Sequence, residues 1–122
     1  MSRRILIAED DHNILISIKF LLENAGYDVI TTTDGARAWE ALESVMPDLA
    51  VLDIMMPALD GFELCRRVRA APELNATKLL ILSARGHQCE IDKALQLGAD
   101  AYMRKPFGTH EFLHTVARLL TV

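Results

Sequence analysis

The chain has 122 residues, of which 51% are hydrophobic and 25% are charged, and this composition predicts one folded domain that spans residues 1–122. Its formal net charge of −4 at pH 7 argues against a surface that binds nucleic acid directly, because such a surface needs clustered lysine and arginine. The first apolar run, residues 5–8, is short and ends in acids, so we expect neither a membrane span nor a secretion signal.

Five short apolar runs are each followed by a pattern typical of an amphipathic helix. In chain order, the runs and their helical patterns are 5–8 with 12–25, 27–33 with 35–45, 49–52 with 61–70, 79–82 with 88–97, and 101–103 with 109–121. This alternation with short connections predicts a doubly wound α/β fold, a three-layer sandwich with helices on both faces of a parallel sheet.

The runs differ in how completely apolar they are. Runs 5–8, 49–52 and 79–82 show no polar alternation, which is typical of parallel strands that helices cover on both faces. Run 27–33 alternates with polar residues and run 101–103 is brief. We therefore expect the first three at the centre of the sheet and the other two at its edges.

The helical patterns also predict which side chains face the sheet. Ala94 and Leu95 share the apolar stripe of the fourth pattern. Arg66, Arg67 and Arg69 belong to the third pattern, and we expect them to form a solvated face because the whole domain is acidic.

The two cysteines, Cys65 and Cys89, lie far apart in the sequence, and neither belongs to a C-x-x-C pair. This spacing predicts neither a disulfide scaffold nor a zinc site. Unpaired cysteines are typical of a reducing compartment, so we expect a cytoplasmic protein with two inert thiols.

The last helical pattern contains HEFLH at residues 110–114, which spells the H-E-x-x-H signature of zinc metalloproteases. Phe112 and Leu113 belong to the buried arc of this pattern, whereas His110 and His114 lie on the opposite, polar side. A zinc protease needs its histidines in a cleft and a third ligand further along the chain, but no His, Asp, Glu or Cys follows His114. We therefore expect two solvated histidines and no zinc site.

Acidic residues follow the first and third apolar runs, where the predicted strands end. They are Glu9, Asp10 and Asp11 after the first run, and Asp53 after the third. Because ligands of open parallel sheets bind outside the carboxyl ends of the strands, we expect these carboxylates to meet there and to repel one another. Either one carboxyl keeps its proton or a hard divalent cation binds, and all-oxygen ligation favours Mg²⁺. Asp11, directly before the first helical pattern, is expected to cap that helix.

Two further predicted strands end at the same edge of the sheet. Ser83 follows the fourth run and offers a hydroxyl donor. Lys105 follows the fifth run, and its ammonium group can pair with a carboxylate or with a phosphoryl oxygen. The bond from Lys105 to Pro106 is a candidate cis peptide that the sequence alone does not decide.

These motifs stand in an order that resembles a known family. The segments ILIAEDD (5–11), DIMMPALDG (53–61), LSA (82–84) and GADAYMRKPF (98–107) make the chain similar to the receiver domain of two-component response regulators, in the superfamily of the chemotaxis regulators. The resemblance covers essentially the whole chain. It implies a flavodoxin-like fold with five helices and a five-stranded sheet in the order 2-1-3-4-5.

The resemblance also implies a metal and a phosphoacceptor. Asp53 would be the phosphoacceptor. The implied ligands of Mg²⁺ are Asp10, Asp53 and the main-chain carbonyl of Met55, with Glu9 holding the ion through water.

A switch is implied as well. Ser83 would hydrogen-bond the phosphoryl group, Lys105 would pair with it, and Tyr102 would be the rotameric switch. The implied function is a phosphorelay receiver, which takes a phosphoryl group from a histidine kinase or phosphotransfer protein. Its altered fourth and fifth strands and helices would then control an output domain or protein. Such a domain modifies only itself, so we expect no turnover enzyme.

The chain departs from the family pattern at two positions. Ser83 replaces a common threonine, and Ala101 stands where many winged-helix regulators have a second aspartate that supports their dimer, so a phosphorylation-dependent dimer is left open. We expect Arg85 to cover the site. Ile16 and Phe20 lie one turn apart on the outward side of the first helix, where family kinases and phosphotransfer proteins dock.

Two other functions are weighed against this one. A receiver that works without phosphorylation, as a protein-interaction module, would not need the intact Asp53 and Lys105. A Mg²⁺-dependent aspartyl phosphatase of the haloacid dehalogenase type would need a second aspartate two residues after the first, but that position is Met55.

Overall fold

The computed structural model describes residues 3–84 and 87–121. The strands are β1 (Arg4–Ala8), β2 (Asp28–Thr32), β3 (Leu49–Asp53), β4 (Lys78–Ser83) and β5 (Ala101–Arg104). The helices are α1 (His12–Asn24), α2 (Gly35–Val45), α3 (Gly61–Ala70), α4 (Gln88–Gln96) and α5 (Thr109–Leu120), with a short 3₁₀ helix at Pro72–Leu74. The predicted strands and helices are thus confirmed in type and order. Across the residues described, no helix is both long and apolar enough to cross a membrane.

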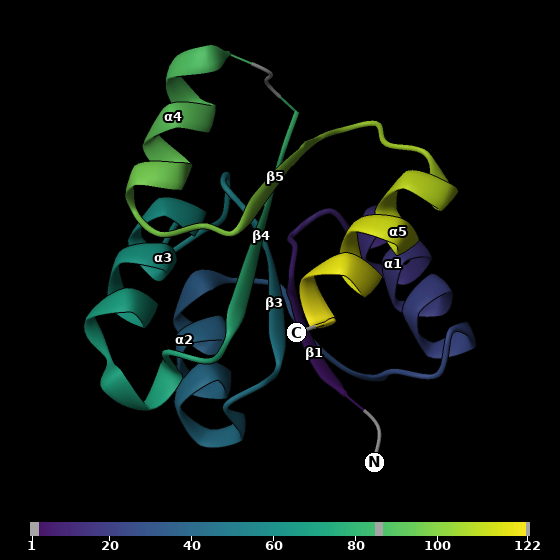
Figure 1. Ribbon diagram of the computed structural model, residues 1–122, viewed down its shortest axis with the longest axis horizontal. Helices are drawn as coiled ribbons and strands as arrows, with labels where there is room; N and C mark the ends of the chain where they lie inside the picture. The colour runs from purple at the N-terminus through teal and green to yellow at the C-terminus, as the bar shows by residue number, and fades with distance from the viewer. Residues whose placement is uncertain (1–2, 85–86, 122) are drawn as a thin grey trace.

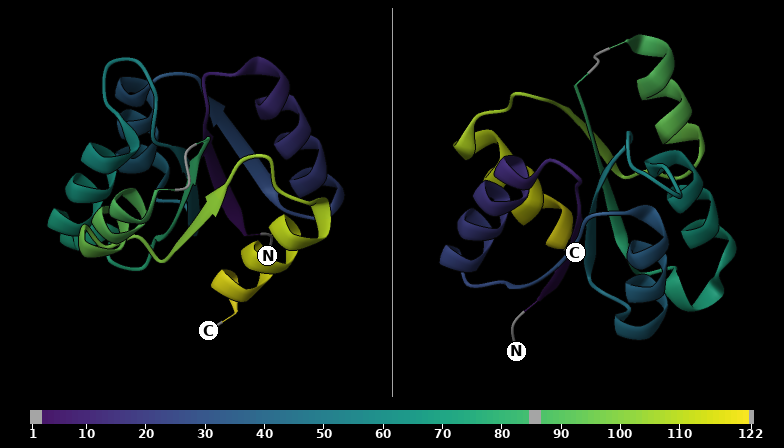
Figure 2. Two further views of the ribbon diagram at one scale, coloured as in Figure 1. Left: turned by 90° about the horizontal axis from the view of Figure 1, so that it is seen from above. Right: turned by 180° about the vertical axis from the view of Figure 1, so that it is seen from behind.

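The strands form one parallel sheet in the order β2-β1-β3-β4-β5, which confirms the order that the resemblance implied. Figure 1 shows α1 and α5 on one face of this sheet and α2, α3 and α4 on the other. Figure 2 shows the same three layers from above and from behind. The predicted doubly wound, flavodoxin-like fold is therefore confirmed, and its winding direction reverses between β1 and β3.

The central strands are uniformly apolar because helices cover both of their faces. In β1, Ile5 and Ile7 pack with α1 and α5, whereas Leu6 and Ala8 pack with the helices on the opposite face. Successive side chains of a strand point to opposite faces, so a strand covered twice needs an uninterrupted apolar run. The edge strands β2 and β5 keep partly exposed side chains, as predicted.

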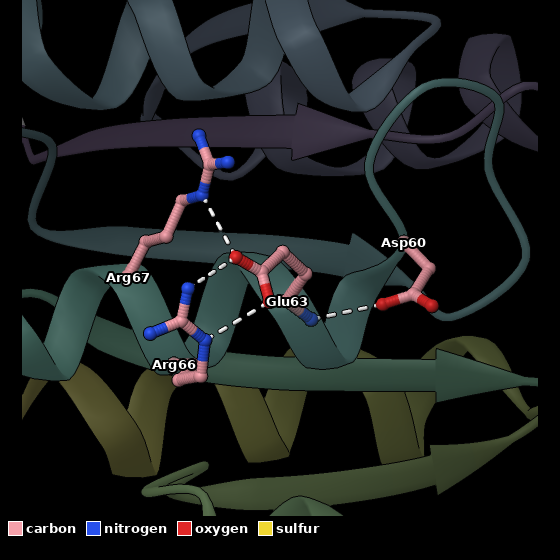
Figure 3. Close-up of polar contacts among 4 residues, drawn as sticks. All are labelled: Asp60, Glu63, Arg66 and Arg67. Carbon is pink, nitrogen blue, oxygen red and sulfur yellow. Dashed lines mark hydrogen bonds and ion pairs between the residues drawn. The ribbon is translucent and has the colours of Figure 1, made fainter.

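The start of α3 is held by ionic contacts on its surface (Figure 3). The carboxylate of Asp60 caps the helix by accepting a hydrogen bond from the amide of Glu63 at 2.8 Å. Glu63 in turn accepts hydrogen bonds from the guanidinium groups of Arg66 and Arg67, which lower the pKa of its carboxyl to about 2. These contacts fix the helix that follows the β3–α3 loop.

Two expectations for the helix faces are wrong. Arg69 is not solvated, because it lies beside main-chain carbonyls that need donors: it donates to the carbonyls of Thr77 and Gly98, both at 2.9 Å. It also pairs with the carboxylate of Asp100 at 2.7 Å. Leu95 does not face the sheet but is 49% exposed, because α4 is short and touches the core through a narrow stripe.

Both cysteines are free, as expected. Cys65 lies on the buried face of α3, where burial raises the pKa of its thiol to about 12, so the thiol stays protonated at neutral pH. Cys89 is exposed at the start of α4, and its inertness stays a prediction.

Candidate functional site

A hollow of about 380 Å³ lies where β1, β3 and β5 end, at the carboxyl edge of the sheet. The residues that line it are Glu9, Asp10, Asp11, Asp53, Met55, Ala84 and Lys105. A larger, mainly apolar cavity of about 580 Å³ adjoins it between α1 and residues 105–107. The predicted acids therefore line a hollow at the surface rather than lying in the closed core.

Three carboxylates meet in the hollow, as predicted. One oxygen from each of Glu9, Asp10 and Asp53 lies within 4.8 Å of the other two. The sheet register brings them together, because Ala8 of β1 pairs with Leu52 of β3 and the residues that follow both lie side by side. Glu9 and Asp53 are buried, whereas Asp10 is exposed. Carboxylates this close, two of them buried, need a proton or a positive charge among them.

The ammonium group of Lys105 supplies positive charge to this cluster. It lies 2.7 Å from one oxygen of Glu9 and 3.2 Å from one oxygen of Asp53. Burial raises the pKa of Glu9 to about 7, although the hydrogen bond from Lys105 opposes this rise. Burial alone would lower the pKa of Lys105, but its contacts with both acids reverse the effect and raise it above 10.5. Lys105 was predicted to pair with a carboxylate or with a phosphoryl oxygen, and in this structure it pairs with carboxylates.

Main-chain amides orient two of the acids. The amide of Asp11 donates to Glu9 at 3.1 Å, and the amide of Met55 donates to Asp53 at 3.4 Å. Asp11 also accepts a hydrogen bond from the amide of Asn13, which confirms that it caps α1. The role of the Met55 carbonyl as a metal ligand stays a prediction.

Ser83 and Tyr102 come from the two strands on the other side of Asp53. Ser83 is 2% exposed and lies one residue beyond Leu82, which pairs with Asp53 in the sheet. Tyr102 is partly buried against the apolar cluster beneath α2, α3 and α4. The amide of Lys105 donates to the carbonyl of Ser83 at 2.7 Å, which ties the segment after β5 to the end of β4. The roles of Ser83 and Tyr102 toward a phosphoryl group stay predictions.

The remaining candidates from the sequence lie outside the hollow or outside the described residues. His110 and His114 are exposed on α5, as expected, and among the described residues no group of three metal-binding side chains includes them. The absence of a zinc site stays a prediction. Arg85 lies outside the described residues. The bond from Lys105 to Pro106 is cis.

The donor set fits a small, hard divalent cation. Glu9, Asp10 and Asp53 offer only carboxylate oxygens. Magnesium prefers oxygen ligands, whereas zinc and copper favour the nitrogen of histidine or the sulfur of cysteine. The open hollow leaves room for the several water molecules that magnesium usually keeps.

Comparison with known proteins agrees with the resemblance found in the sequence. Residues 5–117 match the family model of the response regulator receiver domain. The alkaline phosphatase synthesis transcriptional regulatory protein PhoP of Bacillus subtilis (strain 168) is 39% identical over 120 residues, which are 98% of this chain and 49% of PhoP. The chain thus spans about half the length of the curated relatives it matches.

Solved structures share the fold along the whole chain. The receiver domain of the Francisella response regulator 1452 is 33% identical, with a TM-score of 0.90 over 98% of this chain and 97% of that one. The receiver domain of a sensor histidine kinase from Pseudomonas aeruginosa PAO1 is 28% identical, with a TM-score of 0.91 over 100% of both chains. That structure has a magnesium ion coordinated in its active site cleft.

Proposed function

The chain belongs to the response regulator receiver domain family, and from this premise we propose that it accepts a phosphoryl group on Asp53 from a histidine kinase or phosphotransfer protein. One observation carries the proposal: Asp53 meets Glu9, Asp10 and Lys105 in a hollow that is open to a donor. The phosphorylated domain then controls an output domain or protein.

The proposed reaction needs positive charge more than it needs a base. An oxygen of the Asp53 carboxylate attacks phosphorus, while the bond from phosphorus to the donor atom breaks and its electron pair leaves with the donor. The attacking oxygen and the phosphoryl group are both negatively charged and repel each other. Positive charge placed beside them therefore lowers the energy barrier of the transfer. Lys105, 3.2 Å from Asp53, contributes one positive charge. Magnesium held by Asp10, Asp53 and the Met55 carbonyl, with Glu9 through water, would supply the remaining charge.

The product would act through its added charge. An acyl phosphate brings roughly −1.5 to −2 of charge and three acceptor oxygens to the end of β3. The Ser83 hydroxyl moves toward the phosphoryl group and donates a hydrogen bond to one of these oxygens. Tyr102 then turns into the space that Ser83 has left. The surface of β4, β5, α4 and α5 then shifts its population between two packings, which the output partner distinguishes.

A direct test is to incubate the purified chain with acetyl phosphate or phosphoramidate and Mg²⁺ and to measure its intact mass. A receiver gains the mass of one phosphoryl group and keeps it. A phosphorylation-independent interaction module gains nothing, and an aspartyl phosphatase releases phosphate continuously without a lasting adduct. Either of the last two results would refute the proposal, including its expectation that the chain is not a turnover enzyme.

Magnesium affinity should fall as the pH falls below about 7. Glu9 has a raised pKa of about 7, so below that pH its carboxyl holds a proton that competes with magnesium for the site. We expect the affinity to drop by up to about tenfold per pH unit between pH 7 and pH 5, and to level off above pH 8. Calorimetric titration measures this, and Glu9→Gln should bind more weakly but with a flatter pH dependence between pH 5 and 8. Equal wild-type affinity at pH 6 and pH 8 would contradict it.

The outward face of α1 is proposed to dock the phosphodonor protein. Ile16 and Phe20 are 53% and 64% exposed and lie on the helix that borders the larger apolar cavity. Replacing both by serine should leave folding and reaction with acetyl phosphate unchanged but slow transfer from a phosphotransfer protein. The control is Leu95→Ser, which removes an apolar side chain that is 49% exposed from α4. Equal transfer rates for all three proteins would eliminate this docking surface.

The wider setting is also a proposal. The relative from Bacillus subtilis is a transcriptional regulatory protein about twice as long as this chain, which supports an output domain that this chain does not include. We propose a cytoplasmic phosphoprotein that does not bind nucleic acid through this domain. Size-exclusion chromatography with and without phosphorylation would decide whether the chain forms a dimer on phosphorylation, which the sequence leaves open.

A further inference from the structure

The loop that follows Asp53 rests against the first residue of α2. Gly35 is buried, and its amide donates to the carbonyl of Pro57 at 3.0 Å. A Cβ atom on Gly35 would lie 1.8 Å from the carbonyl oxygen of Leu59 and 2.5 Å from its carbonyl carbon. These distances are far below van der Waals contact, and both atoms are main chain, so no side-chain rotation relieves the overlap.

The loop between Asp53 and α3 is also closed on itself. The amide of Leu59 donates to the carbonyl of Pro57 at 2.9 Å, and Ala58 has a φ of 71°, which is uncommon for a residue with a side chain. The amide of Gly61 donates to the carbonyl of Ile54 at 3.1 Å. A displacement of the middle of this loop therefore also displaces its two ends, near Ile54 and Gly61.

Of the two segments in contact, the loop is the one that would move. The start of α2 is held by Asp34, whose carboxylate accepts a hydrogen bond from the amide of Arg37 at 2.8 Å. Behind it, Ala38 and Leu42 are fully buried in the core. Residues 57–58 of the loop are exposed and have open space on their outer side.

We propose that Gly35 is a positioning residue for the magnesium site. Its missing side chain lets the β3–α3 loop lie close to α2, which sets the place of Met55, whose amide contacts Asp53 at 3.4 Å. This inference rests on the proposed function, because that function makes Asp53 and the Met55 carbonyl ligands of magnesium. Magnesium demands nearly ideal octahedral geometry, so a small displacement of two ligands weakens binding strongly.

The test compares Gly35→Ala with Gly108→Ala. Gly108 is the matched control, because a Cβ there would have nothing within 4 Å. We expect Gly35→Ala to weaken magnesium binding by about 10- to 100-fold, the usual effect of disturbing the support of a ligand, and Gly108→Ala to bind like the wild type. Calorimetric titration measures binding, while circular dichroism and urea unfolding without magnesium report the fold.

A second readout separates positioning from a structural role. Raising the magnesium concentration should restore the rate at which Gly35→Ala reacts with acetyl phosphate while circular dichroism shows an unchanged folded fraction. A variant that is merely unstable would recover its rate only as magnesium raises its folded fraction. Should Gly35→Ala fail to fold, Leu59→Ala is the second variant: it keeps the carbonyl that meets Gly35 but removes the side chain that packs this part of the loop against the core, so it should displace the loop and weaken binding in the same direction.

The outcomes are distinguishable from a failure of the proposed function. Wild-type affinity in Gly35→Ala, or in Leu59→Ala if the first variant does not fold, would overturn the positioning role while leaving the metal site in place. A wild-type chain that binds no magnesium would overturn the metal site and this inference with it.

Discussion

Replacing Asp53 by alanine will abolish the phosphoryl adduct that acetyl phosphate and Mg²⁺ form with the wild-type chain. The carboxylate removed is the proposed nucleophile, and we expect neither Glu9, which is fully buried, nor Asp10, which is assigned to magnesium, to take its place. Intact-mass measurement of both proteins after the same incubation gives the result. Asp28→Ala is the control, because Asp28 is an exposed acid at the start of β2, at the opposite end of that strand from the hollow.

The Asp53→Ala variant should stay folded, which makes the loss of the adduct interpretable. Asp53 contributes to the raised pKa of Glu9, so its removal relieves repulsion between two buried acids. An adduct of undiminished yield in Asp53→Ala would assign the phosphoryl group to another residue and reject the proposed mechanism.

Replacing Lys105 by methionine should slow phosphorylation and destabilise the metal-free chain. Loss of one preorganised positive group beside the reacting oxygens costs about 10²- to 10³-fold in rate. The side chain of Lys105 is 13% exposed and that of Glu9 is fully buried, so Glu9 would be left as a buried carboxylate without its contact at 2.7 Å. Removing one partner of a buried pair costs about 3 kcal/mol of unfolding free energy.

The pH dependence of the Lys105→Met variant identifies the cause of its instability. Glu9 has a raised pKa, so the proton that it holds stabilises the folded state at low pH, and this stabilisation is lost as the pH rises through about 7. Lys105 lowers the pKa of Glu9, so its removal raises that pKa further and the stability difference from the wild type should grow from pH 5 to pH 9. Urea unfolding in the presence of a chelator measures it, with Lys19→Met, an exposed lysine on α1, as the control. A difference that is the same at both pH values would show that Glu9 is not the partner that matters.

The fold and the acidic cluster were predictable because each depends on a repeated local signal. Uninterrupted apolar runs mark β1, β3 and β4 as central strands, and the acids that follow two of them must then meet at one edge of the sheet. Glu9 and Asp53 each stand directly after such a run, so their place required no knowledge of the loops. The family resemblance then assigned roles to residues that the physical argument had already brought together.

Contacts between segments far apart in the sequence were not predictable in the same way. Gly35 meets Leu59, and Arg69 reaches Gly98 and Asp100, through loop conformations that have no periodic pattern. The arginine was expected in solvent because the whole domain is acidic, but the carbonyls beside it belong to other elements. Spacing within one helix contains no information about them.

We propose that Asp53 itself receives the phosphoryl group while the neighbouring acids share a magnesium ion. Borohydride reduces an aspartyl phosphate to homoserine, so reduction of the phosphorylated wild-type chain followed by peptide sequencing locates the modified residue. We expect homoserine at position 53 alone, formed only when Mg²⁺ is present during phosphorylation. Reduction at position 10, a reduced glutamate at position 9, or equal modification in the presence of a chelator would contradict it.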